Sequence, residues 1–187
     1  MHFYGQGPFF CAQTLNERSP SKTISRRSFW NLLKAKHTLS SAESQAICEL
    51  ERGGGLVSLE SLREIAEHAI WVTRAARMPH PKYIAIAHRI WVEPTHKQLC
   101  GSISINQCEL DGSHLRAIIK YAPRADRRVE AWVVAHELAH YLLRNREHEH
   151  VDVQLLTCFL LCPDPTRRRS QHCQPWVREL VRVLESL

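Results

Sequence analysis

The sequence predicts an α+β fold, in which a small antiparallel β-sheet packs on helices. Apolar residues recur at helical spacing before residue 79 and again after residue 128. Between these regions, short runs rich in β-branched and aromatic residues have the composition of strands. The length of 187 residues, with 44% hydrophobic and 24% charged residues, suits one globular domain that can bury a core.

Two helices are predicted ahead of the sheet. Ser40 stands three residues before Glu43, which is the spacing of a capping box, and "SAESQAICELER" follows as a helix that Gly53-Gly54-Gly55 ends. A second helix is expected after Ser58, with apolar residues at helical spacing up to Met78-Pro79. Residues 1–40 are rich in Ser, Thr, Asn and Gln and lack sustained periodicity, although "RSFWNLLKAK" suits a short helix. We therefore predict an N-terminal arm over 1–40 and a single domain over 41–187.

The central region is predicted as three strands. "YIAIAHRIWVE" (83–93) is rich in strand-forming residues, and "GSISINQCEL" (101–110) alternates apolar and polar residues. Asp111-Gly112 offers a tight turn, after which "HLRAIIKYA" (114–122) can return as the third strand. Three helices are expected to follow: "VEAWVVAHELAHYLL" (129–143), "DVQLLTCFLLC" (152–162) and one that begins at Pro175.

The motif His136-Glu137-Leu138-Ala139-His140 lies inside the first of these helices. Side chains at i and i+4 project side by side, so both imidazoles can bind one ion at roughly 2.1 Å. Glu137 lies about 100° further round the helix, from where it can reach a water molecule on that ion. Bound Zn²⁺ brings the pKa of such a water toward ~7, and a carboxylate can then take its proton. The motif thus predicts a site able to attack a peptide carbonyl, with Glu137 as catalytic base.

A catalytic zinc ion needs a third protein ligand. A histidine six residues after His140 would complete one common pattern, but position 146 is Arg. The remaining candidates are Glu147, His148, Glu149, His150 and Asp152, with Asp164 further along the chain.

"AHELAHYLL" followed by "VDVQLLTCFLLCP" resembles the ImmA/IrrE family of zinc metallopeptidases. In that family, a second helix of the form acidic-Ala-Asn-x-Phe-Ala-x-x-Leu-Leu-Met-Pro follows the histidine helix. The resemblance is best over 134–163, extends weakly over 55–165, and aligns the family's acidic ligand with Asp152 and its Asn with Gln154. It implies a zincin-like core in which His136, His140 and Asp152 hold Zn²⁺. The family's ligand is usually Glu and lies further from the histidine helix, so His148, Glu149 and His150 stay open as alternatives.

The resemblance also implies a function. We expect a zinc-dependent endopeptidase that cleaves or otherwise inactivates a helix-turn-helix transcriptional repressor in a stress or mobile-element response. A substrate strand would add to an exposed sheet edge, either 102–108 or 114–121. The alternative is a zinc-binding anti-repressor or toxin-type protein that acts by binding, although such a site has no need of Glu137 as a base. A third hypothesis is a basic DNA-binding protein in which the His136–His140 motif occurs by chance. It rests on the net charge of +6.

Three features bear on location. No stretch approaches the roughly 18 apolar residues that would span a bilayer. The N-terminal "MHFYGQGPFFCAQ" has no basic residue before its apolar part, so it does not have the pattern of a secretory signal. The seven cysteines are odd in number and irregularly spaced, which fits a reducing compartment better than a disulfide scaffold. The sequence therefore predicts a cytoplasmic protein with no membrane contact, and it leaves room for an indirect association with DNA through the basic surface.

Overall fold

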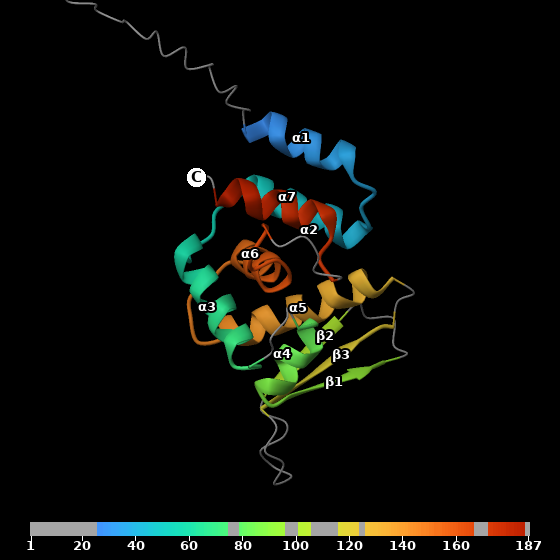
Figure 1. Ribbon diagram of the computed structural model, residues 1–187, viewed down its shortest axis with the longest axis vertical. Helices are drawn as coiled ribbons and strands as arrows, with labels where there is room; N and C mark the ends of the chain where they lie inside the picture. Colours follow the sequence, from blue (N-terminus) through green and yellow to red (C-terminus); the bar gives the residue numbers. More distant parts are fainter. Residues whose placement is uncertain are drawn as a thin grey trace, which may run out of the picture.

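The computed structural model describes residues 26–74, 79–95, 101–105, 116–123, 126–166 and 172–185. The expected turn at Asp111-Gly112 and residues 1–25 of the expected arm lie outside these ranges. Within them the chain forms seven helices and three strands in an α+β arrangement (Figure 1). Their bounds are α1 Arg26–Lys36, α2 Ser41–Arg52, α3 Leu59–Trp71, α4 Pro81–Ala87, β1 Ile90–Pro94, β2 Gly101–Ile105, β3 Ala117–Tyr121, α5 Arg127–Leu143, α6 His150–Leu161 and α7 Pro175–Leu184.

The three strands form a mixed sheet in the order β1-β3-β2. β2 runs antiparallel to β3, with Ile103 opposite Ile119, whereas β1 runs parallel to β3, with Val92 opposite Ile119. The prediction of an antiparallel sheet is therefore wrong for β1. The central position of β3 also means that 114–121 does not supply a free edge, whereas β1 and β2 are the two edge strands of this sheet.

The error at β1 has a local cause, because the first half of the expected strand 83–93 is the helix α4. Pro81 stands at the first helical position, and the His80 ring accepts a hydrogen bond from the Lys82 amide at 3.1 Å, so a helix start is encoded here. Burial within α4 follows a helical pattern, with Ile84 and Ala85 buried and the residues on either side exposed or half-buried. The chain then turns through Arg89, whose φ is 61°, and enters β1.

The predicted start and end of α2 are confirmed. The Ser40 hydroxyl accepts from the Glu43 amide at 3.3 Å, and the Ser40 amide donates to the Glu43 carboxylate at 2.8 Å. The second oxygen of Glu43 accepts from the Trp176 indole of α7 at 2.8 Å, so the cap also ties α2 to the C-terminal helix. Gly53 and Gly54 have φ of 73° and 101°, values that favour glycine and that end the helix.

Helix α1 lies within the segment 1–40. Trp30 and Leu33 on its inner face are buried in the common core. Lys36 donates to the Glu179 carboxylate of α7 at 2.9 Å, which links the end of α1 to the C-terminal helix. The described part of this segment therefore contributes to the packed domain.

Helix α6 occupies the centre of the fold and is seen end-on in Figure 1. Helices α2, α3, α5 and α7 all pack against it, and of residues 151–161 all but Leu155 are buried. Helix α5 lies between α6 and the sheet, where it contacts β2 and β3 on one side and α6 on the other. This layering places one face of α5 opposite the first turn of α6.

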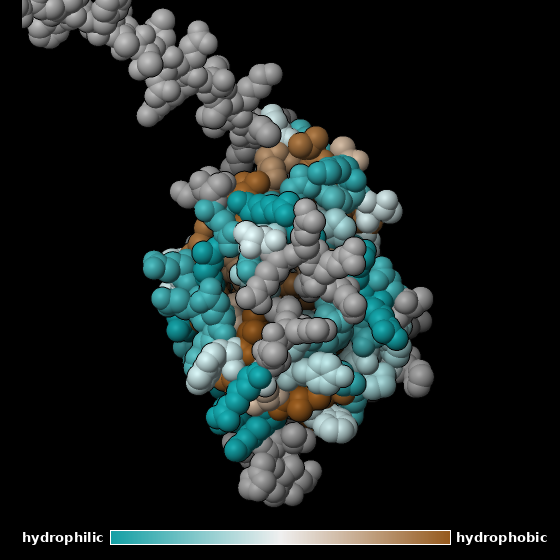
Figure 2. Space-filling view, viewed as in Figure 1, coloured by the Kyte–Doolittle hydropathy of each residue, from teal (hydrophilic) through white to brown (hydrophobic). Residues whose placement is uncertain are grey.

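Hydrophilic side chains cover most of the face shown in Figure 2, and hydrophobic side chains appear there in small separate areas. The most exposed large hydrophobic side chains in the described residues are Trp71, Tyr83 and Leu56, which are 71%, 61% and 56% exposed. None of the described helices is long and apolar enough to cross a membrane.

Candidate metal centre

Helix α5 carries the motif predicted from the sequence. It begins at Asp126, whose carboxylate accepts from the Arg128 amide at 2.8 Å, and it is anchored by buried residues such as Val134 and Leu138. His136 and His140 lie on one face of the helix, and their ring centroids are 4.9 Å apart. The expectation that these two imidazoles project side by side is confirmed.

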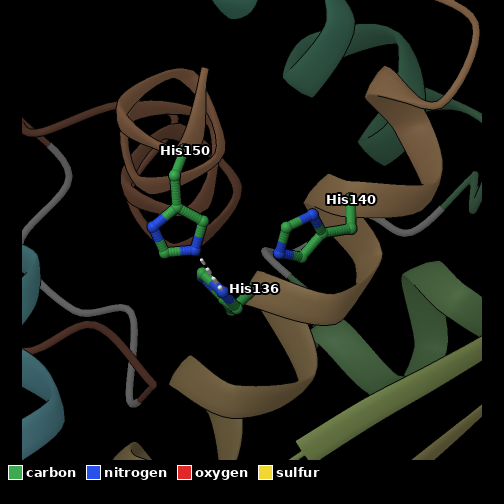
Figure 3. A group of neighbouring side chains, drawn as sticks. All are labelled: His136, His140 and His150. Atoms are coloured by element: carbon green, nitrogen blue, oxygen red, sulfur yellow. Dashed lines mark hydrogen bonds between the residues drawn. The ribbon is translucent and has the colours of Figure 1, made fainter. Parts of the chain in front are cut away.

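A third histidine faces this pair from another helix. His150 is the first residue of α6, and its Nε2 atom lies 3.3 Å from Nε2 of His136. One nitrogen from each of His136, His140 and His150 lies within 4.8 Å of the other two. Figure 3 shows the three rings pointing toward one another, two from α5 and one from α6. Among the described residues, no other group of three His, Cys, Asp or Glu side chains comes this close.

These three side chains lie close enough to bind a metal ion. Two nitrogens bound at about 2.1 Å to a tetrahedral ion are about 3.4 Å apart, which matches the separation of 3.3 Å between the two Nε2 atoms. The Nδ1 atom of His150 donates to Glu49 at 2.7 Å, so its Nε2 presents a lone pair to the cluster. A cation between the rings is the natural partner for such lone pairs, and an all-imidazole set suits Zn²⁺ and its neighbours in the transition series.

The electrostatics of the two α5 histidines favour this role. Burial, together with the neighbouring rings of His140 and His150, lowers the pKa of His136 to about 4. Burial is also the main cause that lowers the pKa of His140. Both rings are therefore neutral at physiological pH, which is the form that binds metal ions.

Glu137 lies beside the start of strand β2. Its Oε1 atom is 2.8 Å from the point where a Cβ atom at position 101 would lie, and Val133 Cγ1 is 2.5 Å from the same point. Gly101 therefore makes room for the carboxylate between α5 and β2. Burial raises the pKa of Glu137 to about 7, with the nearby His150 acting in the opposite direction. A carboxylate with such a pKa can both take and return a proton near neutral pH.

Asp152, the ligand that the alignment favoured, is not part of the cluster. Its side chain is completely buried, and its carboxylate accepts from the amides of Leu56, Val57 and Glu149 at 2.9, 3.3 and 2.8 Å. The backbone of Gly55 approaches so closely that a Cβ there would lie 2.3 Å from Asp152 Oδ1. Asp152 thus fastens the α2–α3 loop to the first turn of α6.

Helix geometry explains why His150 takes the place expected for Asp152. Two positions along an α-helix correspond to a rotation of about 200°, so residues 150 and 152 face nearly opposite sides of α6. Only one of them can face α5. His150 is among the alternatives that the sequence leaves open, and in the structure it is the candidate third ligand.

The other candidates point elsewhere. The Nδ1 atom of His148 donates to the Arg146 carbonyl at 2.8 Å, and Glu147 and Glu149 are exposed. The Asp164 carboxylate accepts from the Thr166 amide at 2.9 Å within its own turn. None of these four residues belongs to the histidine cluster.

One further residue beside the cluster, Glu49, has no signal in the sequence. The carboxylate of Glu49, on α2, accepts from Nδ1 of His150 at 2.7 Å and from Gln154 at 3.0 Å through one oxygen, and from Gln45 at 3.0 Å through the other. Burial raises the pKa of Glu49, but the hydrogen bonds from Gln45, Gln154 and His150 outweigh it and lower the pKa overall. Glu49 is 101 positions from His150, and no local pattern joins them.

Comparison of the chain with protein-family models, with curated proteins and with solved structures gave no match. What the histidine cluster can do therefore has to be inferred from its geometry and from the chemistry of its side chains.

Proposed function

We propose that this protein is a zinc-dependent endopeptidase with a zincin-like active site. The observation that carries the proposal is the convergence of three imidazoles on one point, with the Glu137 carboxylate adjacent on the same helix. Three nitrogen ligands and no sulfur favour a catalytic zinc site over a structural one, because structural sites are usually closed by four ligands rich in Cys. The His150 side chain is 45% exposed, so the cluster is accessible from solvent on that side.

The chemistry follows from the roles of the side chains. His136, His140 and His150 would hold the ion, which when bound acidifies a water molecule and polarises a carbonyl oxygen. Glu137 would take a proton from the water molecule that attacks the peptide carbonyl. The same carboxyl group can then return the proton to the departing amine, for which a pKa of about 7 is suitable.

Strand β2 is our candidate for substrate binding. It is an edge strand of the sheet, and it begins at Gly101, directly beside the Glu137 carboxylate. A peptide that adds to this edge would form main-chain hydrogen bonds with β2. Its backbone carbonyls would then pass close to the histidine cluster.

The resemblance to the ImmA/IrrE family extends the proposal to a substrate. We propose that the protein cleaves or inactivates a helix-turn-helix transcriptional repressor in a stress or mobile-element response. A histidine in place of the family's acidic ligand leaves the ligand set neutral, and a neutral ligand set makes the bound ion more electrophilic. The substitution does not affect Glu137, the proposed base. The role of Glu137 is therefore unchanged in this chain.

Two variants test the proposal against the alternative of a zinc-binding protein without proteolytic activity. Wild type, Glu137→Gln and His136→Ala are loaded with zinc and incubated with a proteome-derived peptide library, and cleavage is read by mass spectrometry. We expect cleavage by the wild type, zinc retention without cleavage in E137Q, and loss of both zinc and cleavage in H136A. A wild type that carries zinc but yields no cleavage beyond that of E137Q would overturn the endopeptidase proposal and favour a binding role.

A further inference from the structure

We propose that Glu49 is a positioning residue that orients His150 for metal binding. This inference rests on the proposed function, because it assumes that the histidine cluster binds a metal ion. Glu49 is not one of the proposed ligands. Among the three histidines of the cluster, His150 is the one that comes from outside α5, so its ring is not placed by the geometry of that helix. Another contact must therefore hold the His150 ring in its orientation.

The hydrogen bond between His150 and Glu49 is that contact. Nδ1 of His150 donates to Oε2 of Glu49 at 2.7 Å, while Nε2 on the opposite side of the ring faces His136 at 3.3 Å. A hydrogen bond to a carboxylate at one ring nitrogen fixes the proton there and leaves the lone pair on the other. The same bond increases the electron density of the ring and therefore its strength as a ligand.

Glu49 is itself held in place by its neighbours. Gln154, one turn after His150 on α6, donates to the same carboxylate oxygen at 3.0 Å, and Gln45, one turn before Glu49 on α2, donates to the other oxygen at 3.0 Å. The Glu49 side chain is 20% exposed, whereas that of His150 is 45% exposed. A buttressed and largely buried acceptor thus restrains a more exposed ring, which would otherwise sample several rotamers in solvent.

The arrangement also makes α2 part of the site. Helix α2 contributes no residue to the histidine cluster, yet its position sets where the ring of His150 points. Asp152 reinforces the same relationship, because its carboxylate fastens the loop after α2 to the first turn of α6. Metal affinity should therefore depend on the packing of α2 against α6.

The test compares zinc affinity in wild type, Glu49→Gln, Glu49→Ala and the control Glu51→Gln. Glu51 lies on the same helix and pairs with Lys34, so E51Q removes the same charge from α2 without touching His150. Affinity is measured by competition with a chromophoric chelator. We expect zinc binding to weaken about 10-fold in E49Q and up to about 100-fold in E49A, the range found for outer-shell partners of metal-binding histidines. E51Q should bind like wild type.

A second measurement separates positioning from a general loss of stability. Long-range ¹H–¹⁵N spectra of the zinc-loaded protein report which nitrogen of His150 carries the proton. We expect a single Nδ1–H form in wild type and E51Q, and exchange between ring orientations in E49A. E49Q preserves the size of the side chain. If E49A does not fold, the zinc affinity of E49Q therefore tests the positioning role.

The outcomes are distinguishable. If wild type binds zinc and E49Q and E49A bind it no more weakly than E51Q, the positioning role is overturned while the metal centre stands. If wild type fails to bind zinc at all, the metal centre itself is rejected, and the role of Glu49 is rejected with it.

Discussion

The Nε2 atoms of His136 and His150 lie 3.3 Å apart, although the residues are 14 positions apart and belong to different helices. Such a separation matches two ligands of one tetrahedral ion, and it depends on how α6 packs against α5. The three-residue cluster is therefore a property of the helix pair.

His150→Ala should abolish tight zinc binding, because it removes one of three protein ligands. The loss should exceed the 10–100-fold change expected for outer-shell residues. Zinc should raise the melting temperature of the wild type, because it binds only the folded state, and it should not raise that of H150A. His148→Ala is the matched control, since His148 donates to a backbone carbonyl and lies outside the cluster. Equal zinc affinity in H150A and H148A would remove His150 from the ligand set.

Asp152→Asn should destabilise the fold without abolishing zinc binding. The carboxylate accepts from three backbone amides, and an asparagine amide offers one acceptor oxygen in place of two. We expect a loss of about 2–3 kcal/mol in the free energy of unfolding, measured by urea denaturation, because a buried amide loses its charged acceptor. Asp164→Asn, which alters a carboxylate that accepts from Thr166, is the control and should cost less. If D152N bound no zinc yet kept wild-type stability, Asp152 would be a ligand after all.

Glu137→Gln should stabilise the metal-free protein in a pH-dependent manner. Burial raises the pKa of Glu137 to about 7 in the folded state, from 4.5 when it is unperturbed. The unfolded state thus loses its proton first as pH rises, and wild type loses stability between pH 4.5 and about 7. The loss is about 3.5 kcal/mol at most, since one pKa unit corresponds to about 1.4 kcal/mol. Urea denaturation with chelator present should show E137Q more stable than wild type at pH 8 and equally stable at pH 4. Parallel pH profiles for the two proteins would contradict the buried position of this carboxylate.

Gly101→Ala should displace the Glu137 carboxylate or shift β2. A Cβ at this position would lie 2.5 Å from Val133 Cγ1 and 2.8 Å from Glu137 Oε1, closer than real contacts allow. A glycine-to-alanine change can stabilise a protein by about 0.4–1 kcal/mol, because it lowers the conformational entropy of the unfolded chain. Overpacking destabilises the folded state by about 1–3 kcal/mol, so we expect a net loss of stability. Zinc content should stay at the wild-type level while peptide cleavage falls. Ser104→Ala on the same strand is the control, and a G101A protein with unchanged stability and activity would refute the close approach.

Local signals in the sequence were sufficient for much of the fold. The Ser40–Glu43 capping box and the glycines after it correctly defined α2, because caps depend on residues within one turn. Strands β2 and β3 fell within the predicted runs for a similar reason. The interpretation of 83–93 as a strand was wrong in its first half, where the His80-Pro81 start signal outweighed the strand-forming composition. The parallel pairing of β1 with β3 could not be predicted, since it depends on the path of the intervening chain.

The sequence by itself determined the half of the candidate site that a single helix can encode. His136 and His140 are side by side because an α-helix brings i and i+4 to one face, and Glu137 follows from the same geometry. Only the tertiary structure decided between His150 and Asp152, because the packing angle of α6 selects which face of its first turn meets α5. It alone also brought Glu49 to the His150 ring across 101 positions of the chain. Contacts between distant elements arise from the burial of apolar surface in three dimensions, so they cannot be predicted from the spacing of residues along the chain.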